Sequence, residues 1–159
     1  MKKLILAAAP AALIAVFAAS PVSAGNTHLS GFIDEVCEAV VVDNDLWLSG
    51  NVVAGATIGT DVNFDCNDHD GATVTLTSTE GGLESDDDED FEVEYVATLV
   101  AGPMSIVLDT GLTTNVNDIS ETGQLPNSSP NGTMTIVLSD SAPWAGGYSD
   151  TIQVDIAAN

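Results

Sequence analysis

The stretch of sequence that decides the fold reads Ile58-Gly59-Thr60-Asp61-Val62-Asn63-Phe64-Asp65-Cys66. Every second residue from Ile58 onward is apolar or a threonine, and the residues between them are small or polar. Successive side chains of a β-strand point to opposite faces, so this alternation predicts a strand with one buried face and one solvated face. Helix-forming residues with a period of 3.6 are missing beyond residue 24.

The same alternation continues along the chain. It recurs in residues 72–77, 91–99, 104–108, 134–138 and 152–156, and in a shorter piece in which Leu46 and Leu48 flank Trp47. Turn-forming pairs separate these runs, namely Asp70-Gly71, Gly81-Gly82, Gly102-Pro103, Asn131-Gly132 and Gly146-Gly147. The polar residues 110–130 are predicted to form a long surface connection. About seven short strands separated by such turns predict an all-β fold, an antiparallel β-sandwich of the immunoglobulin-like kind.

Residues 1–24 have the features of a secretory signal peptide. Lys2 and Lys3 precede an apolar run from Leu4 to Ala19, and Val22-Ser23-Ala24 places small residues where a signal peptidase cuts. The run is short for a membrane span. We therefore expect export, cleavage after Ala24, a single domain of residues 25–159 and no membrane insertion after cleavage.

The charge balance excludes two classes of partner. The sequence has 24 acidic residues and only two basic ones, Lys2 and Lys3, which lie in the predicted signal. Binding to nucleic acid or to an anionic membrane requires Lys or Arg, so neither is expected. Unopposed carboxylates repel one another, and salt screens this repulsion. The acidity fits a salty or calcium-rich habitat, and it equally fits a strongly hydrated surface.

Cys37 and Cys66 are the two cysteines of the chain. An exported protein meets an oxidising environment, so one disulfide between them is expected. Closing that loop contributes about 3–4 kcal/mol in the chain-entropy model. The alternative is a metal held by two thiolates, but the sequence has neither a Cys-x-x-Cys spacing nor a nearby histidine pair to support it.

Catalysis has little support in the sequence. The predicted mature chain has His28 and His69 but no lysine or arginine, and no Gly-x-Ser-x-Gly motif occurs. His28 lies close to the predicted new N-terminus, and His69 has no serine or cysteine nucleophile beside it in the sequence. A pair of carboxylates remains compatible with the composition, but we expect no enzymatic activity.

Calcium is the one cofactor that the sequence suggests. Residues 84–90 read Glu-Ser-Asp-Asp-Asp-Glu-Asp and are predicted to form an acidic loop between two strands. Calcium takes six to eight oxygen ligands, mostly from carboxylates. The candidate ligands are Glu84, Asp86, Asp88 and Asp90. A solvated acidic loop without a metal is the favoured interpretation.

Cysteine placement and the C-terminal strand together resemble a known family. After Cys37 comes the segment Leu46-Trp47-Leu48-Ser49-Gly50. The second cysteine ends the predicted strand that closes with Val62-Asn63-Phe64-Asp65-Cys66. The last alternating run is preceded by Gly146-Gly147-Tyr148-Ser149-Asp150. This arrangement resembles subunits of chaperone–usher pili, in particular the archaic class that includes the spore coat protein U-like domain. The resemblance spans nearly the whole predicted mature chain.

The resemblance implies a sandwich without its final strand and a disulfide between its first two strands. In that family a periplasmic chaperone first fills the gap, an outer-membrane usher supports assembly, and the N-terminal extension of a neighbouring subunit then takes the chaperone's place. The donor strand would be the segment from Gly25 to Ile33, with Leu29, Gly31 and Ile33 on one face. The acceptor groove would be bordered by Ile152, Val154 and Ile156.

These observations lead to two hypotheses from different classes. The first is a structural subunit of an extracellular pilus or surface coat, exported through the periplasm and assembled by donor-strand complementation. Its partners would be neighbouring subunits, the chaperone and the usher. The alternative is a secreted binding or adhesion module that depends on calcium.

Overall fold

The computed structural model describes residues 28–48, 52–112 and 119–159. The chain separates into two compact units, Met1–Phe32 and Ile33–Asn159. The described part of the first unit, residues 28–32, contains no helix or strand. The second unit is built from β-strands, with a single turn of 3-10 helix at Thr110–Leu112 among its described residues. The predicted signal peptide and its cleavage point lie outside the described residues.

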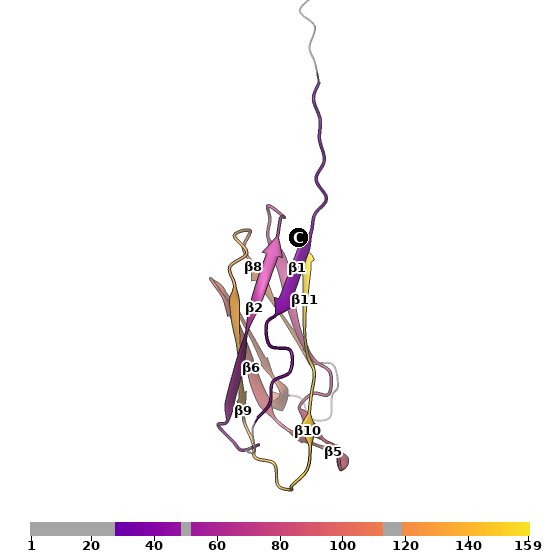
Figure 1. The fold of residues 1–159 in the computed structure, drawn as a ribbon, viewed down its shortest axis with the longest axis vertical. Helices are drawn as coiled ribbons and strands as arrows, with labels where there is room; N and C mark the ends of the chain where they lie inside the picture. The colour runs from indigo at the N-terminus through magenta and orange to yellow at the C-terminus, as the bar shows by residue number, and fades with distance from the viewer. Residues whose placement is uncertain (1–27, 49–51, 113–118) are drawn as a thin grey trace, which may run out of the picture. The chain divides into compact units, whose positions relative to one another are not determined.

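The described residues of the second unit form three antiparallel sheets, which Figure 1 shows in ribbon form. Sheet I has five strands in the order β1 (Cys37–Val41), β2 (Thr57–Cys66), β9 (Gly132–Leu138), β6 (Tyr95–Ala101) and β7 (Met104–Asp109). Sheet II has three strands in the order β11 (Ile152–Ala158), β3 (Ala72–Ser78) and β8 (Ile119–Leu125). Sheet III is small and consists of β10 (Tyr148–Ser149), β4 (Leu83–Ser85) and β5 (Asp88–Val93).

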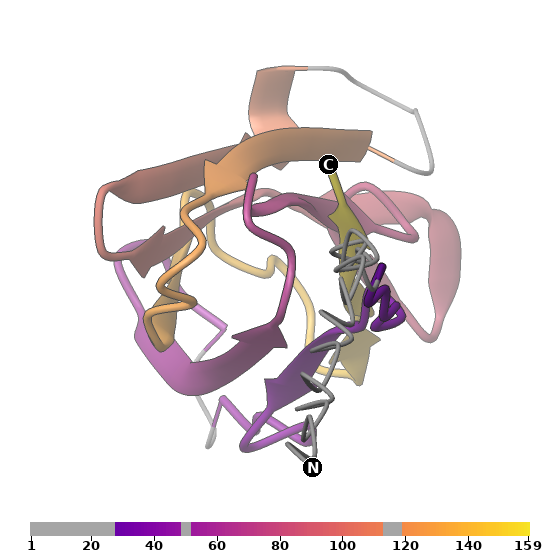
Figure 2. The same cartoon turned by 90° about the horizontal axis from the view of Figure 1, so that it is seen from above.

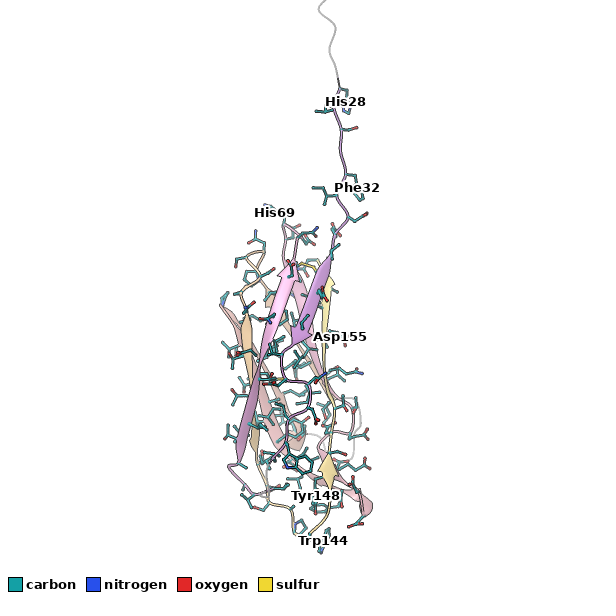
Figure 3. All side chains as sticks on the ribbon, in the orientation of Figure 1. His28, Phe32, His69, Trp144, Tyr148 and Asp155 are labelled. Atoms are coloured by element: carbon teal, nitrogen blue, oxygen red, sulfur yellow. A yellow bond between two sulfur atoms is a disulfide. The ribbon has the colours of Figure 1, made fainter. Side chains whose placement is uncertain are left out.

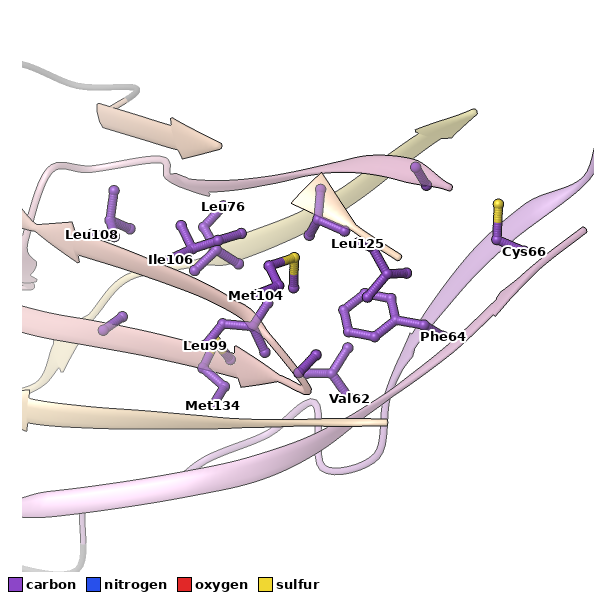
Figure 4. Packing of buried hydrophobic residues seen from close by; sticks show 14 of the residues in the cluster. Val62, Phe64, Cys66, Leu76, Leu99, Met104, Ile106, Leu108, Leu125 and Met134 are labelled. Carbon is purple, nitrogen blue, oxygen red and sulfur yellow. The ribbon is translucent and has the colours of Figure 1, made fainter. Parts of the chain in front are cut away.

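Sheets I and II face each other across one apolar core (Figures 2 and 4). Phe64 and Leu99 of sheet I belong to the same buried cluster as Leu76 of sheet II. Alternate residues of β2, β3, β6 and β7 are buried, as the period of two predicts. The predicted all-β antiparallel sandwich is confirmed.

Residues 91–99, predicted as one strand, form parts of two. The alternation runs unbroken through them, but pairing breaks at Glu94, because β5 pairs with β4 in sheet III and β6 pairs with β7 and β9 in sheet I. Thr110 contacts the chain at this break. Its hydroxyl accepts a hydrogen bond of 2.9 Å from the N–H of Tyr95, the first residue of β6. Hydrophobic periodicity reports which face is buried, and it carries no information about which strand is the partner.

Two further predictions about strands are wrong. Residues 119–125 form β8 at the edge of sheet II, although 110–130 was predicted as a connection. At its inward position β8 has Gly123, where an added Cβ would lie 2.6 Å from Cγ1 of Ile106, so glycine is the residue that allows β8 to pack there. The piece around Trp47 is not a strand, because residues 43–48 have no ladder partner.

Candidate functional site: the seam between β1 and β11

The sandwich has a seam where its two sheets end on the same side. Among the described residues, sheet I ends at β1, which pairs only with β2, and sheet II ends at β11, which pairs only with β3. β1 and β11 approach each other without forming a ladder, as Figure 1 shows. We call this boundary, from Cys37 to Val41 on one side and from Ile152 to Ala158 on the other, the seam.

The inward side chains of both seam strands are only half-buried. Those of β1 are Cys37, Ala39 and Val41, and those of β11 are Ile152, Val154 and Ile156. All six pack against the core, yet the inward residues of β2 and β3 behind them, such as Val62 and Leu76, have no exposed surface. Ile152, Val154 and Ile156, predicted to border an acceptor groove, are thus half-buried inward residues of an edge strand, and their role in strand addition stays a prediction.

The seam also exposes backbone hydrogen-bonding groups. In an antiparallel ladder, alternate residues of an edge strand direct their N–H and C=O groups away from the partner. The seven residues of β11 thus have one side bonded to β3 and the other side facing the seam. An unpaired edge next to half-buried apolar side chains is a template for another strand.

The seam widens into a groove where β1 ends. β1 has five residues and β2 has ten, so the part of β2 from Thr57 to Asp61 extends beyond β1. The groove has a volume of about 1010 Å³, and its apolar lining includes Ile58, Ile136 and Ile152. That volume lies at the upper end of the range for small-molecule sites, roughly 300–1,000 Å³, so several side chains of an added segment would fit.

Aromatic and acidic residues form the rim of this groove. Trp47, Trp144 and Tyr148 line it together with Asp43 and Asp45. Figure 3 shows Trp144 and Tyr148 at one end of the domain. Trp144 is held by an edge-on contact with Phe91, with ring centroids 4.9 Å apart, and its carbonyl accepts a hydrogen bond from the Tyr148 hydroxyl at 3.2 Å.

One carboxylate fixes the end of β11 next to the groove. Oδ2 of Asp150 accepts hydrogen bonds from the hydroxyls of Tyr95 and Ser78, both at 2.6 Å. Oδ1 accepts the N–H groups of Glu80 at 3.1 Å and Thr151 at 2.6 Å. Burial, together with the Asp150 charge, raises the pKa of the Tyr95 hydroxyl, which therefore stays a donor.

The opposite end of β11 is fixed as well. The Asn159 N–H donates to Oδ2 of Asp68 at 3.0 Å, and its side-chain amide donates to the carbonyl of Asp70 at 3.2 Å. On the other side of the seam the predicted disulfide joins Cys37 to Cys66, which are directly opposite each other in the β1–β2 ladder. Both ends of β11 and one end of β1 are thus fixed, and each strand is paired along its length with one neighbour, β3 for β11 and β2 for β1. The disulfide also indicates an oxidising, non-cytoplasmic environment.

The predicted donor segment leads into the domain at Asp34. The Asn67 side-chain amide donates to the Asp34 carbonyl at 2.9 Å, and the Val36 N–H donates to Oδ1 of Asn67 at 2.7 Å. Leu29 and Gly31 belong to the first unit and Ile33 to the second, so their role as a donor strand stays a prediction. None of them is in a strand, and Gly25 lies outside the described residues.

The acidic residues 84–90 form a β-hairpin and not the predicted loop. β4 and β5 pair across a tight turn, and the Asp86 N–H donates to the carbonyl of Gly147 at 3.0 Å. Among the described residues, no group of three or more His, Cys, Asp or Glu side chains has an arrangement that could hold a metal ion. The side chains of Asp88 and Asp90 lie outside the described residues, so calcium binding by Glu84, Asp86, Asp88 and Asp90 stays a prediction.

Compared with the models of known protein families and with curated proteins, the sequence matches none. The resemblance to pilus subunits thus remains a prediction. Across the described ranges, no helix is long and apolar enough to cross a membrane.

Sequence reasoning missed the groove and its rim. Leu46 and Leu48 were predicted to belong to a strand, and both line the groove instead. In the sequence, Asp150 belongs only to the segment Gly146 to Asp150 that precedes the last alternating run. Its three hydroxyl partners, Tyr95, Thr79 and Ser78, lie 55, 71 and 72 residues away in the sequence, so no local pattern indicates them.

Proposed function

We propose that this chain is a structural subunit of an extracellular pilus or surface coat, and that its seam receives a β-strand from another chain. The observation that carries the proposal is the pair of unpaired strand edges, β1 and β11, with half-buried apolar side chains between them. An added strand would bond to the free backbone of an edge and cover the apolar side chains with its own alternate residues. In this proposal the domain is an immunoglobulin-like sandwich whose last strand comes from a neighbour.

The segment from Gly25 to Ile33 of a neighbouring copy is the proposed donor. Extended, it would span roughly 30 Å, which exceeds the roughly 24 Å length of a strand of seven residues such as β11. Leu29, Gly31 and Ile33 would face the core, and Gly31 would fit where the seam is narrow. Before assembly, a periplasmic chaperone would cover the seam, and an usher would direct the exchange.

A deletion tests the proposal directly. The exported chain is compared with a variant that lacks Gly25 to Ser30, each produced with its chaperone, by negative-stain electron microscopy of the extracellular material. We expect fibres from the wild type and none from the deletion variant, which should still fold with its chaperone. A synthetic peptide of residues 25–36 should then bind the deletion variant and raise its melting temperature. The matched control is the same peptide with Ile33→Asp.

Two results would contradict the proposal. Fibres from the deletion variant would show that this segment is not the donor. A wild-type chain that stays monomeric at high concentration, and whose melting temperature does not respond to the peptide, would show that the seam accepts no strand.

A further inference from the structure

Both tryptophans of the chain lie on the rim of the groove next to the seam. Trp47 and Trp144 are 79% and 57% exposed, although tryptophan is on average a largely buried residue. Phe91 contacts the Trp144 ring edge-on, and the Tyr148 hydroxyl bonds to the Trp144 carbonyl, so this part of the rim is held by its neighbours (Figure 3). The groove therefore offers aromatic surface that the described part of the domain leaves uncovered.

The same rim carries negative charge from separate parts of the chain. Four carboxylates line the groove, those of Asp43, Asp45, Asp86 and Asp150. The described part of the chain has no lysine or arginine to oppose them. A cleft with charges of one sign and apolar walls concentrates the electrostatic field and attracts groups of the opposite charge. The groove is thus complementary to a cation.

The combination of aromatic rings and carboxylates favours a guanidinium group. The face of a tryptophan ring attracts cations, and a carboxylate accepts strong hydrogen bonds from them. The planar guanidinium does both, because it stacks on aromatic rings and donates two parallel hydrogen bonds to one carboxylate. A second copy of this chain has no such group, since the sequence contains no arginine and its two lysines lie in the predicted signal.

We propose that the groove binds an arginine side chain presented by a different protein. Arginine and aromatic residues are both enriched in protein–protein interfaces. The groove volume of about 1010 Å³ exceeds that of one guanidinium, so apolar residues next to the arginine would fit against Ile58, Ile136 and Ile152. The partner is therefore a protein that exposes arginine beside apolar side chains.

This interaction goes beyond the proposed strand exchange. The donor segment from Gly25 to Ile33 contains no lysine or arginine, so it does not supply the cation. The aromatic and acidic rim residues lie outside β1 and β11, the strands that a donor would join. The two interactions thus use different chemistry and different residues, and each can be removed without the other.

Fluorescence titration of the full exported chain tests the proposal, because both tryptophans lie on the groove and report on its occupant. The probe is a five-residue peptide of alternating valine and arginine with blocked ends. The matched peptide has citrulline, which keeps the shape of arginine without its charge. In 0.05 M NaCl the arginine peptide should bind at least fivefold more tightly than the citrulline peptide and at least threefold more tightly than a lysine peptide. Its affinity should fall as NaCl is raised to 0.5 M, because salt screens the attraction.

Substitutions on the rim locate the site. Asp43→Asn and Asp45→Asn each remove one charge and should weaken binding of the arginine peptide at least threefold. Trp47→Leu removes an exposed ring and should weaken it similarly, with Trp144 as the remaining reporter. The matched control is Asp65→Asn, which removes the same charge from an exposed residue of β2 outside the groove and should bind as the wild type does. Melting curves verify that each variant folds.

Three results would overturn the proposal. Equal affinity for the arginine and citrulline peptides would show that the groove selects no cation, and equal affinity for the arginine and lysine peptides would show that it does not select a guanidinium. Equal weakening by Asp65→Asn and Asp45→Asn would show that net charge alone attracts the peptide. The peptide of residues 25–36 separates this site from strand exchange. If that peptide fails to bind while the arginine peptide binds and Asp45→Asn weakens it, only the strand exchange is wrong, and the reverse pattern overturns only the arginine site.

Discussion

The hydroxyl of Tyr95 on β6 donates a 2.6 Å hydrogen bond to Asp150, immediately before β11, and so ties sheet I to the start of the seam strand. Tyr95 is almost fully buried, with 1% of its surface exposed. The bond joins sheet I to the connection between β10 and β11, two residues before β11 begins. It therefore acts on the position of β11 and not only on the packing around Tyr95.

Tyr95→Phe should destabilise the domain. A hydrogen bond to a charged group contributes about 1.5–3 kcal/mol, and its loss leaves the Ser78 hydroxyl as the other donor to Oδ2 of Asp150. Urea denaturation at pH 7 measures the change. The matched control is Tyr148→Phe, because that hydroxyl bonds to the exposed Trp144 carbonyl and its loss should change stability by less than about 0.5 kcal/mol.

The same pair predicts a loss of stability in alkali. Burial raises the pKa of Tyr95 above its ordinary value of 10.0, so the fold favours the protonated hydroxyl. This contribution is complete below the pKa of the unfolded chain and is lost as the pH rises above about 10. The wild type should therefore lose stability from pH 9 to pH 11 more steeply than Tyr95→Phe. If the free energy of unfolding falls with pH equally steeply in the wild type and in Tyr95→Phe, the protonation of Tyr95 is not linked to unfolding.

Glu92→Gln should stabilise the protein at neutral pH. Partial burial raises the pKa of the Glu92 carboxyl, and three neighbouring carboxylates, those of Asp150, Glu80 and Glu94, raise it further. The fold thus favours protonated Glu92, and this preference is lost as the pH rises through its folded pKa. The melting temperature of the variant should exceed that of the wild type at pH 7, and the two should converge near pH 3. Glu121→Gln, at an exposed residue of β8, is the control, and an equal effect there would mean that only net charge matters.

Gly123→Val should be strongly destabilising. An added Cβ would lie 2.6 Å from Cγ1 of Ile106 and 3.0 Å from Cγ of Met104, so both core side chains would have to move. Overpacking of this kind costs about 1–3 kcal/mol. Thermal melting measures the effect, with Thr122→Val on the outward side of the same strand as the control. If the two variants melt alike, β8 does not pack on the core as described.

Gly123 also shows where sequence reasoning reaches its limit. The strands β2, β3, β7 and β9 were predictable, because most of their inward positions have apolar side chains, with Thr60, Ser78 and Gly132 as the exceptions. β8 was not, because Glu121 and Gly123 occupy two of its four inward positions, and the packing of Gly123 depends on Ile106 in another strand. The strand β11 was predictable from the alternation of Ile152, Val154 and Ile156. The groove was not, since its volume depends on β1 ending before β2, and sequence periodicity does not give the length of a partner strand.

Salt should raise the melting temperature of the exported chain. The carboxylates of the chain have no basic side chains to oppose them beyond the predicted signal, and 1 M NaCl screens their repulsion more than 0.1 M does. Differential scanning calorimetry at both concentrations measures the shift. Calcium chloride at matched ionic strength serves as the comparison. A much larger effect of calcium would favour the alternative function, a calcium-dependent adhesion module, and a melting temperature that neither salt changes would show that the charges are too dispersed to matter.

Val154→Glu should block strand addition at the seam. Val154 is an inward, half-buried residue of β11 and belongs to the apolar surface that a donor strand would cover. A carboxylate there would be desolvated by the incoming strand without a cationic partner, which is unfavourable. The variant and the reference domain are both produced without Gly25 to Ser30. The peptide of residues 25–36 should bind the Val154→Glu domain at least tenfold more weakly than the reference domain. Gln153→Glu adds the same charge to the adjacent outward position, which is exposed, and should bind the peptide as the wild type does. A melting curve of each variant without peptide verifies folding, and Val154→Ala, which adds no charge, separates lost packing from desolvation. If Val154→Glu folds and binds the peptide as tightly as Gln153→Glu, the donor strand does not enter the seam beside β11.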